Sequence, residues 1–125
     1  MNISSLIIVI LSMFFTYHTG NTSHYAKDVM QWQVDYHNLV LPCEGCAIAV
    51  EDCSEIGNHW WIRPLGSSEE WTEVVVADCA GRDAYDKNGV SWMTKNNVIC
   101  ELSYLLAQKY DAIGTSIKIE VLKER

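Results

Sequence analysis

The sequence predicts a small, mainly β domain that closes into a barrel, with one or two short helices and disulfide cross-links. Several short apolar segments are separated by polar turns, which is typical of small barrels. Residues 116–122 alternate apolar and polar side chains at the period of a strand. Five cysteines follow an apolar N-terminal segment, a combination typical of exported, disulfide-bonded proteins. The 125 residues are enough for one small domain.

Residues 1–20 have the features of a secretory signal peptide. Within them, residues 6–15 are continuously apolar and shorter than the roughly 20 residues that a membrane span needs. Thr19 and Gly20 offer a cleavage site near position 20, and cleavage predicts a secreted or extracytoplasmic protein. The alternative is an uncleaved N-terminal anchor, which is the one case in which we expect a membrane as partner.

Residues 21–42 are predicted to form an extension that precedes the barrel domain of residues 43–125. Residues 21–27 are polar and fit a mobile N-terminal end. Residues 29–40 match the helical and the strand period about equally well. We interpret them as a short amphipathic helix that leads into an extended piece.

The buried centre of the predicted sheet is the segment 71–77. Val74, Val75 and Val76 are β-branched and consecutive, which favours a strand buried on both faces. Asp78 follows at once, so polar chemistry lies at the end of this strand, where binding sites often form. Other predicted strands are 47–50, 59–63, 98–100 and 116–122.

Two short helices are predicted in the second half of the chain. Residues 92–97 fit a single helical turn that ends at an Asn pair. Ser103 is a suitable N-cap for a helix whose apolar face is formed by Leu105, Leu106 and Tyr110. Gly114 is expected to end that helix.

The charge of the chain excludes some partners. Its formal net charge is −7, and every Asp, Glu, Lys and Arg lies after residue 20. An acidic chain repels phosphate backbones, so we expect no nucleic acid as partner. The sequence contains no phosphate-binding loop and no dinucleotide fingerprint, and we expect no cofactor.

The cysteines predict one disulfide and leave the others open. Cys53 and Cys79 each stand at a predicted strand end and form the expected pair. Either Cys43 or Cys46 is expected to pair with Cys100, which leaves one odd thiol and allows a monomer or a thiol-linked dimer. A structural zinc site needs four ligands, and Cys43-x-x-Cys46 lacks a second pair, so we expect no metal.

Several segments of the chain resemble a known barrel family. The rare-lipoprotein-A-like double-psi β-barrel has a strand ending in Asp, an Asp-Leu-Ser that opens a short helix, and a closing strand; expansin-like barrels look similar. The chain also resembles small secreted bacterial proteins of unassigned function that carry Asp-Cys-Ala-Gly, Trp-Met…Asn-Asn and an early Cys. The matching segments here lie between Ala47 and Leu122: Val74–Asp78, Cys79–Gly81, Trp92–Asn97, Ile99–Ser103, Ala107, Gly114, Ile117–Leu122, and Cys53.

The resemblance implies a double-psi barrel with a glycan groove. Asp78 matches the family Asp that ends the strand, and Glu101 stands where the second Asp of the groove is found. Two carboxylates facing one groove can divide acid and base roles. The structural alternative is that Asp78 hydrogen-bonds the loop at Gly81 and Arg82, and that Glu101 faces solvent or pairs with Arg82.

Tryptophans suggest further glycan contacts, since aromatic faces stack on sugar rings. Trp60 and Trp61 are adjacent in a strand and must face opposite sides, so one of them is buried. Trp92 is expected in the core. Trp71 lies beside a polar turn and is expected to be exposed. The candidate ligand-binding residues are Trp71, Trp61 and Arg82.

Three functional hypotheses follow. The first is a secreted extracellular or cell-envelope module that binds a cell-wall glycan and is not clearly catalytic. The second is a lytic enzyme acting on peptidoglycan or another polysaccharide, with Asp78 as acid/base and Glu101 assisting. The third is a surface protein that binds a partner and uses its odd cysteine for a covalent dimer.

Overall fold

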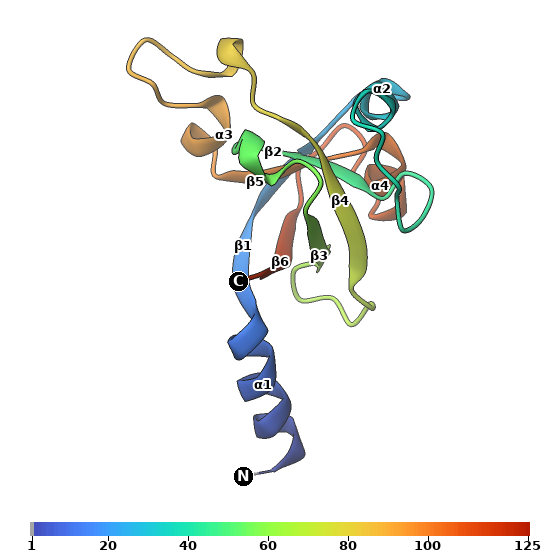
Figure 1. Ribbon diagram of the computed structural model, residues 1–125, viewed down its shortest axis with the longest axis vertical. Helices are drawn as coiled ribbons and strands as arrows, with labels where there is room; N and C mark the ends of the chain where they lie inside the picture. The colour runs from blue at the N-terminus through green and yellow to red at the C-terminus, as the bar shows by residue number, and fades with distance from the viewer. Residues whose placement is uncertain (1) are drawn as a thin grey trace.

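Six strands close into a barrel in the computed structural model, which describes residues 2–125 (Figure 1). Around the barrel the strand order is β1-β5-β2-β4-β3-β6. The pairs β1–β5 and β2–β4 are parallel and the other four are antiparallel. The predicted mainly β barrel is therefore confirmed. The strands are β1 (Phe15–His24), β2 (Ala47–Val50), β3 (His59–Pro64), β4 (Thr72–Cys79), β5 (Val98–Leu102) and β6 (Lys118–Glu124).

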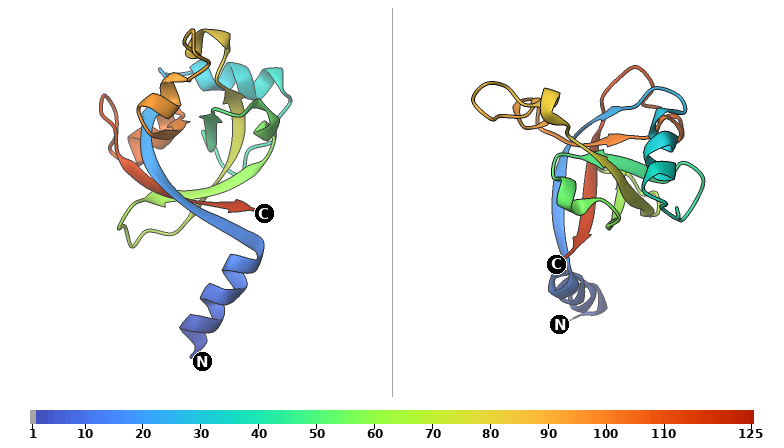
Figure 2. Two further views of the ribbon diagram at one scale, coloured as in Figure 1. Left: turned by 90° about the vertical axis from the view of Figure 1, so that its left-hand side faces the viewer. Right: turned by 45° about the horizontal axis from the view of Figure 1, so that its top comes forward.

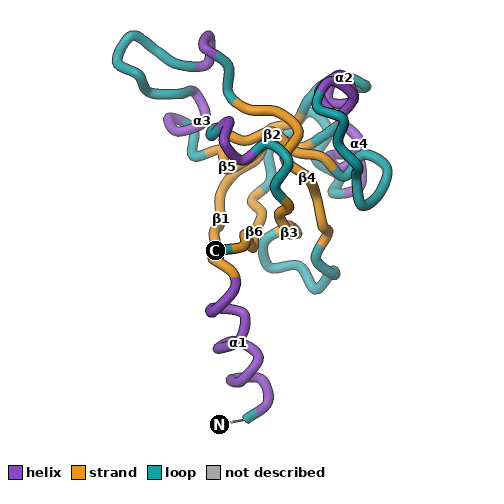
Figure 3. The backbone as a smooth tube through the Cα atoms, in the orientation of Figure 1, coloured by secondary structure: helices purple, strands orange, loops and turns teal. Residues whose placement is uncertain are grey.

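Short helices lie outside the barrel wall (Figure 3). The Ser103 hydroxyl accepts the Leu106 N–H and caps α4, as predicted. The Ser91 hydroxyl caps α3 in the same way by accepting the Thr94 N–H. The helices are α1 (Ile3–Phe14), α2 (Val29–Tyr36), α3 (Trp92–Lys95) and α4 (Tyr104–Lys109), with single 3-10 turns η1 (Cys53–Glu55) and η2 (Arg82–Ala84).

The barrel begins at Phe15, and this corrects the predicted start at Cys43 and the predicted mobile end at residues 21–27. The first part of β1 pairs with β6 from Phe15 to Asn21, and the last part pairs with β5. Both partners lie far away in the sequence, so the local polar composition of β1 did not reveal a strand. The predicted cleavage position near Gly20 lies within this strand.

Helix α1 continues directly into β1 and extends away from the barrel (Figure 2). The C-terminus lies beside this junction, where the Arg125 N–H donates to the Phe14 carbonyl at 2.9 Å. Within residues 2–125, none of the helices combines the length and the apolar character needed to span a membrane.

The apolar core fills the barrel interior from alternate positions of β2 to β6, and β1 adds Gly20 and the buried Thr22, which are paired with the interior residues Ile119 and Cys100. Trp60 is the buried member of the Trp pair, and Leu106 and Tyr110 enter this core from α4 and just after it. Leu105 is 45% exposed, so the predicted apolar face of this helix is narrower than expected. The interior side chains of the strands are Ile48, Val50, Trp60, Ile62, Val74, Val76, Cys100, Leu102, Ile119 and Val121.

A second apolar cluster covers the outer face of β2 and β4. Met30 and Val34 of α2 pack there against Ala47, Ala49 and Ala77. Because α2 covers this face while the barrel interior covers the other, β4 is buried on both sides, as its consecutive valines predicted.

The disulfides confirm one prediction and correct another. Cys53 and Cys79 are bonded, with their Cα atoms 4.9 Å apart. Cys43 is bonded to Cys46 and not to Cys100. Cys100 points into the barrel and is fully buried, and this burial raises the pKa of its thiol. The odd thiol is thus absent from the surface that a covalent dimer requires.

Candidate functional site

Four residues form one row across four neighbouring strands on the outside of the barrel. Ser23 of β1 is paired with Glu101 of β5, Glu101 with Ala49 of β2, and Ala49 with Asp78 of β4. Directly paired residues present their side chains on the same face of a sheet. The structure therefore brings the predicted carboxylates Asp78 and Glu101 to either side of Ala49, with Cα atoms roughly 10 Å apart at two strand spacings.

A break in strand register places Asp78 in this row. Ile48 is paired with Val76, but the next residue, Ala49, is paired with Asp78, so Ala77 is the extra residue of a bulge. Bulges re-aim a side chain at the end of a strand. The neighbouring Cys79 is bonded to Cys53, which fixes this end of β4 to η1.

Both carboxylates accept hydrogen bonds from uncharged donors. The Tyr25 hydroxyl donates to Asp78 Oδ2 at 2.5 Å, and the Cys79 N–H donates to Asp78 Oδ1 at 2.8 Å. The Ser23 hydroxyl donates to Glu101 Oε1 at 2.8 Å. Within residues 2–125, neither carboxylate forms an ion pair. The structure thus contains neither the predicted contact of Asp78 with the loop at residues 81–82 nor an Arg82–Glu101 pair.

Tyr25 lies within the electric field of both carboxylates. Burial is the main cause that raises the pKa of its phenol well above the usual value, followed by its hydrogen bond to Asp78 and the charges of Asp78 and Glu101. A raised pKa keeps the phenol protonated and therefore keeps it a donor to Asp78.

A cavity of about 440 Å³ adjoins the row at Ser23. Its side chains are mostly hydroxyls and amides, and its aromatic wall is Trp92, which is 46% exposed. The ring of His24 is held by the Gly114 N–H, which donates to Nε2 at 2.8 Å. Among the described residues 2–125, no Asp, Glu, Lys or Arg lines it. Its lining residues are Asn21, Thr22, Ser23, His24, Trp92, Asn96, Val98, Gly114, Thr115 and Ser116.

The exposure of Trp92 corrects the prediction that it belongs to the core. The buried residue of α3 is its neighbour Met93, which is 3% exposed. The sequence predicts a helical turn at residues 92–97, but successive residues of a helix point about 100° apart, and either Trp92 or Met93 could face the barrel. Only the packing of α3 on β5 shows which one does so.

The three predicted ligand-binding residues, Trp61, Trp71 and Arg82, lie outside the row and the cavity. Trp61 is on the outer face of β3, where its ring packs edge to face against the ring of Phe15, with the ring centres 5.3 Å apart. The Arg63 guanidinium covers Trp71 at 4.2 Å from the ring centre. Arg82 is exposed in η2. The structure therefore does not bring Trp61, Trp71 and Arg82 together with the carboxylates.

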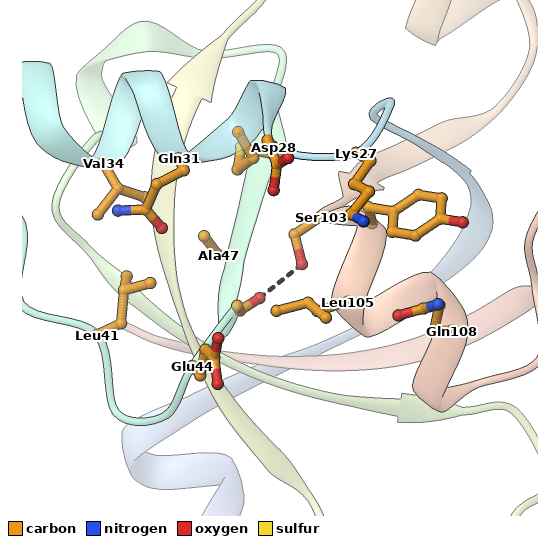
Figure 4. A pocket seen from close by; sticks show the side chains of 13 residues that line it. Lys27, Asp28, Gln31, Val34, Leu41, Glu44, Ala47, Ser103, Leu105 and Gln108 are labelled. Carbon is orange, nitrogen blue, oxygen red and sulfur yellow. Dashed lines mark hydrogen bonds between the residues drawn. The ribbon is translucent and has the colours of Figure 1, made fainter.

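A second cavity of about 620 Å³ lies between α2 and α4 on the same outer face (Figure 4). Gln31 of α2 and Gln108 of α4 stand on opposite walls, and Ala47 of β2 lies at its back. The Ser103 hydroxyl donates to the Gly45 carbonyl at 2.5 Å and closes one side. Since Ala47 and Ala49 are both in the cluster under α2, this cavity and the row are parts of one face.

No protein-family model matches the chain, and no curated protein matches it in sequence. Within residues 2–125, no group of three or more His, Cys, Asp or Glu side chains is arranged to hold a metal ion. The site is therefore defined by its own geometry: two carboxylates held by neutral donors, next to an uncharged cavity with an exposed indole.

Proposed function

We propose that this protein is a secreted or extracytoplasmic module that binds a glycan. The observation that carries the proposal is the cavity beside Ser23, in which one exposed Trp92 ring stands among hydroxyl and amide side chains. A sugar ring has an apolar face that fits an aromatic ring, and hydroxyls that pair with amides, hydroxyls and carboxylates. Asp78 and Glu101 supply such acceptors along the adjoining row.

Secretion is supported by the two disulfides. Disulfides persist in oxidising compartments and are rare in the cytosol. Cys53–Cys79 and Cys43–Cys46 use four of the five cysteines, and the fifth is buried where reagents do not reach it. This arrangement suits a protein that works outside the cytoplasm.

Binding is favoured over cleavage by the hydrogen bonds of Asp78. A general acid in glycoside cleavage must carry a proton that it donates. Both oxygens of Asp78 already accept hydrogen bonds, from Tyr25 and from the Cys79 N–H, so the group serves as an acceptor. The lytic alternative rests on the placement of Asp78 and Glu101 on either side of Ala49.

A sedimentation assay tests the binding proposal. Purified full-length protein is mixed with insoluble peptidoglycan, chitin and cellulose, and the bound fraction is measured against protein concentration. Trp92→Ala is expected to weaken binding about tenfold, because the stacking of the indole on a sugar ring is lost. Trp32→Ala removes a 68% exposed indole on α2 and serves as the matched control. Absence of binding to all three polysaccharides, or unchanged binding by Trp92→Ala, contradicts the proposal.

The same preparations test the lytic alternative. Peptidoglycan is incubated with the wild type and with Asp78→Asn, and soluble fragments are measured over time. The binding proposal predicts equal background release from both proteins. Release by the wild type that is lost in Asp78→Asn establishes the enzyme instead.

A further inference from the structure

We infer that His24 positions one wall of the Trp92 cavity and makes glycan binding depend on pH; the inference rests on the proposed glycan-binding function and adds how that site is regulated. The neutral imidazole holds the loop of residues 111–117, between α4 and β6, against the end of β1. The protonated imidazole releases this loop, so the cavity is fully formed at neutral pH and loosened below about pH 6.

The first argument is that the hydrogen bonds of the His24 ring fix its protonation state. The Gly114 N–H donates to Nε2 at 2.8 Å, so this nitrogen carries no proton. The other nitrogen, Nδ1, lies 3.0 Å from the Tyr25 carbonyl oxygen, which can only accept, so Nδ1 carries the proton. The ring is therefore the neutral Nδ1–H form. A second proton on Nε2 points at the Gly114 N–H, and two donors cannot form a hydrogen bond.

The second argument is that the bond to His24 holds the tip of the loop. The loop is anchored on both sides of the tip, because Ala112 is 1% exposed and the Ser116 hydroxyl donates to a carbonyl of β1 at 2.6 Å. Among residues 2–125, the other hydrogen bond formed by residues 113–115 stays within the loop, from the Thr115 N–H to the Ala112 carbonyl at 3.3 Å. Protonation of His24 therefore removes the hydrogen bond that ties the tip to the barrel.

The third argument is that the loop forms part of the cavity. Gly114, Thr115 and Ser116 line it together with Trp92 and the end of β1. Gly114 has a φ of +74°, in a region that glycine enters and leaves without strain. The position of the tip is thus set by its contact with His24, and loss of that contact changes the shape of the space that receives the sugar ring.

The fourth argument is that the surroundings of His24 do not favour its protonated form. The ring packs edge to face against the ring of Tyr104, with the ring centres 6.3 Å apart. None of the ion pairs within residues 2–125 includes His24, and the carboxylate of Glu101 on the paired strand accepts from Ser23. Protonation therefore costs the Gly114 hydrogen bond and forms no ion pair in exchange. The titratable or charged side chains of the segments around the ring are Tyr25, Lys27, Asp28, Cys100, Glu101, Tyr104, Lys109, Tyr110, Asp111 and Lys118.

Binding at two pH values tests the inference. The bound fraction of the full-length protein on insoluble peptidoglycan, chitin and cellulose is measured at about pH 7.5 and at about pH 5.5, on either side of the usual imidazole titration. We expect binding to be about fivefold weaker at the lower pH, because one hydrogen bond that shapes the cavity is lost.

Three variants assign the pH dependence to one imidazole. His24→Gln keeps an acceptor oxygen that takes up no proton in this range, and it is expected to bind equally at both pH values. His24→Ala removes the acceptor and is expected to bind at the higher pH as weakly as the wild type does at the lower pH. His37→Gln removes a half-buried imidazole that does not line the cavity, and it is expected to keep the pH dependence.

Nuclear magnetic resonance measures the same contact without a ligand. Nitrogen-15 spectra of the wild type at about pH 7.5 are expected to show an unprotonated Nε2 on His24. The Gly114 amide resonance is expected to shift as the ring takes up a proton, and to stay constant over the same range in His24→Gln. A protonated Nε2 at the higher pH, or a Gly114 resonance that does not follow His24, overturns the positioning role.

The outcomes separate this inference from the proposed function. Equal binding by the wild type at both pH values overturns the pH dependence and leaves glycan binding intact. A pH dependence that persists in His24→Gln, or that is lost equally in His37→Gln, overturns the inference as well. Failure of the wild type to bind any of the three polysaccharides at either pH overturns the proposed function and its regulation together, while the spectra still test the contact between His24 and Gly114.

Discussion

Two tyrosine–carboxylate contacts on the outside of the barrel show how the same local pair serves different ends. Tyr17 donates to Glu120 at 2.8 Å on the β1–β6 wall, and Tyr25 donates to Asp78 at 2.5 Å beside β4. On the first wall, Arg63 closes the set with an ion pair of 2.8 Å to Glu120. Beside β4, no cation of residues 2–125 pairs with Asp78.

The difference shows which of the two sets is structural. The Arg63 guanidinium also stacks on Trp71 and donates to the Glu69 carbonyl at 3.3 Å, so its donors are directed to the protein itself. The Tyr17–Glu120–Arg63 set is satisfied and stabilises the wall. The Tyr25–Asp78 set has no counter-charge among residues 2–125 and is held by a phenol and a backbone N–H alone.

The largest expected effect comes from the Cys53–Cys79 disulfide, which fixes the end of β4 next to Asp78. Cys53→Ser with Cys79→Ser removes a cross-link between residues 26 apart, and the chain-entropy estimate is a loss of about 3–4 kcal/mol. Cys43→Ser with Cys46→Ser, at a separation of 3, is expected to cost only about 1–2 kcal/mol. Urea unfolding measures both. Equal losses contradict the assignment of Cys53–Cys79 as the main covalent anchor.

The next effect separates the two sets by stability. Arg63→Ala leaves Glu120, whose side chain is only 10% exposed, without its cation, and about 2–3 kcal/mol of unfolding free energy is expected to be lost. Asp78→Asn keeps an oxygen that accepts from Tyr25 or the Cys79 N–H, and its expected loss is about 0.5 kcal/mol. Urea unfolding checks this order: the midpoint urea concentrations of the two variants are compared, provided that their m-values are equal. If Asp78→Asn loses more stability than Arg63→Ala, the Tyr25–Asp78 contact also has mainly a stabilising role, which contradicts the comparison.

The smallest effect is a pair of opposite shifts in phenol titration. The hydrogen bond to Glu120 is the main cause that raises the pKa of Tyr17, while the Arg63 charge lowers it, so Arg63→Ala raises this pKa further. Burial and the contact with Asp78 raise the pKa of Tyr25, so Asp78→Asn lowers it. Ultraviolet absorbance of the phenolate, with Tyr17→Phe and Tyr25→Phe for assignment, measures both. Shifts in the same direction contradict the comparison.

These raised pKa values also set the sign of the alkaline pH dependence. Both phenols hold their protons in the folded protein above the usual value of 10.0, at which the unfolded chain releases them. Their contribution to stability is therefore complete below pH 10.0 and is lost as the pH rises through the folded-state values. Tyr25→Phe is expected to flatten the alkaline fall in stability more than Tyr17→Phe, because Tyr25 is the more buried.

Local pattern was sufficient for much of the fold. The consecutive valines of β4 predicted a strand buried on both faces, and the alternation in β6 predicted which residues enter the core. Ser103 predicted the start of α4 because a cap depends on the next three residues alone. The prediction that Cys53 pairs with Cys79 is confirmed: Cys79 ends β4, and Cys53 begins η1 shortly after β2, the strand that pairs with β4.

The candidate site was predictable only in part. Asp78 and Glu101 were singled out through the family resemblance, and barrel register brings them to either side of Ala49. Ser23 and Trp92 were missed, because a polar strand and a single helical turn carry no local signal of what they face. Trp61 and Trp71 were predicted in their place. In the structure Phe15 packs against Trp61 and Arg63 covers Trp71, and no short-range pattern reveals either contact.

Short-range patterns therefore account for the elements, the caps and one cross-link, because each depends on residues close together in the chain. The row of Ser23, Glu101, Ala49 and Asp78 depends on pairings between segments up to 78 residues apart, as the Ser23–Glu101 hydrogen bond shows. Strand order, a bulge in β4 and barrel closure set those pairings, and all three result from packing of the whole interior. The closed barrel therefore decides that Glu120 lies beside Arg63 and that Asp78 lies beside Tyr25.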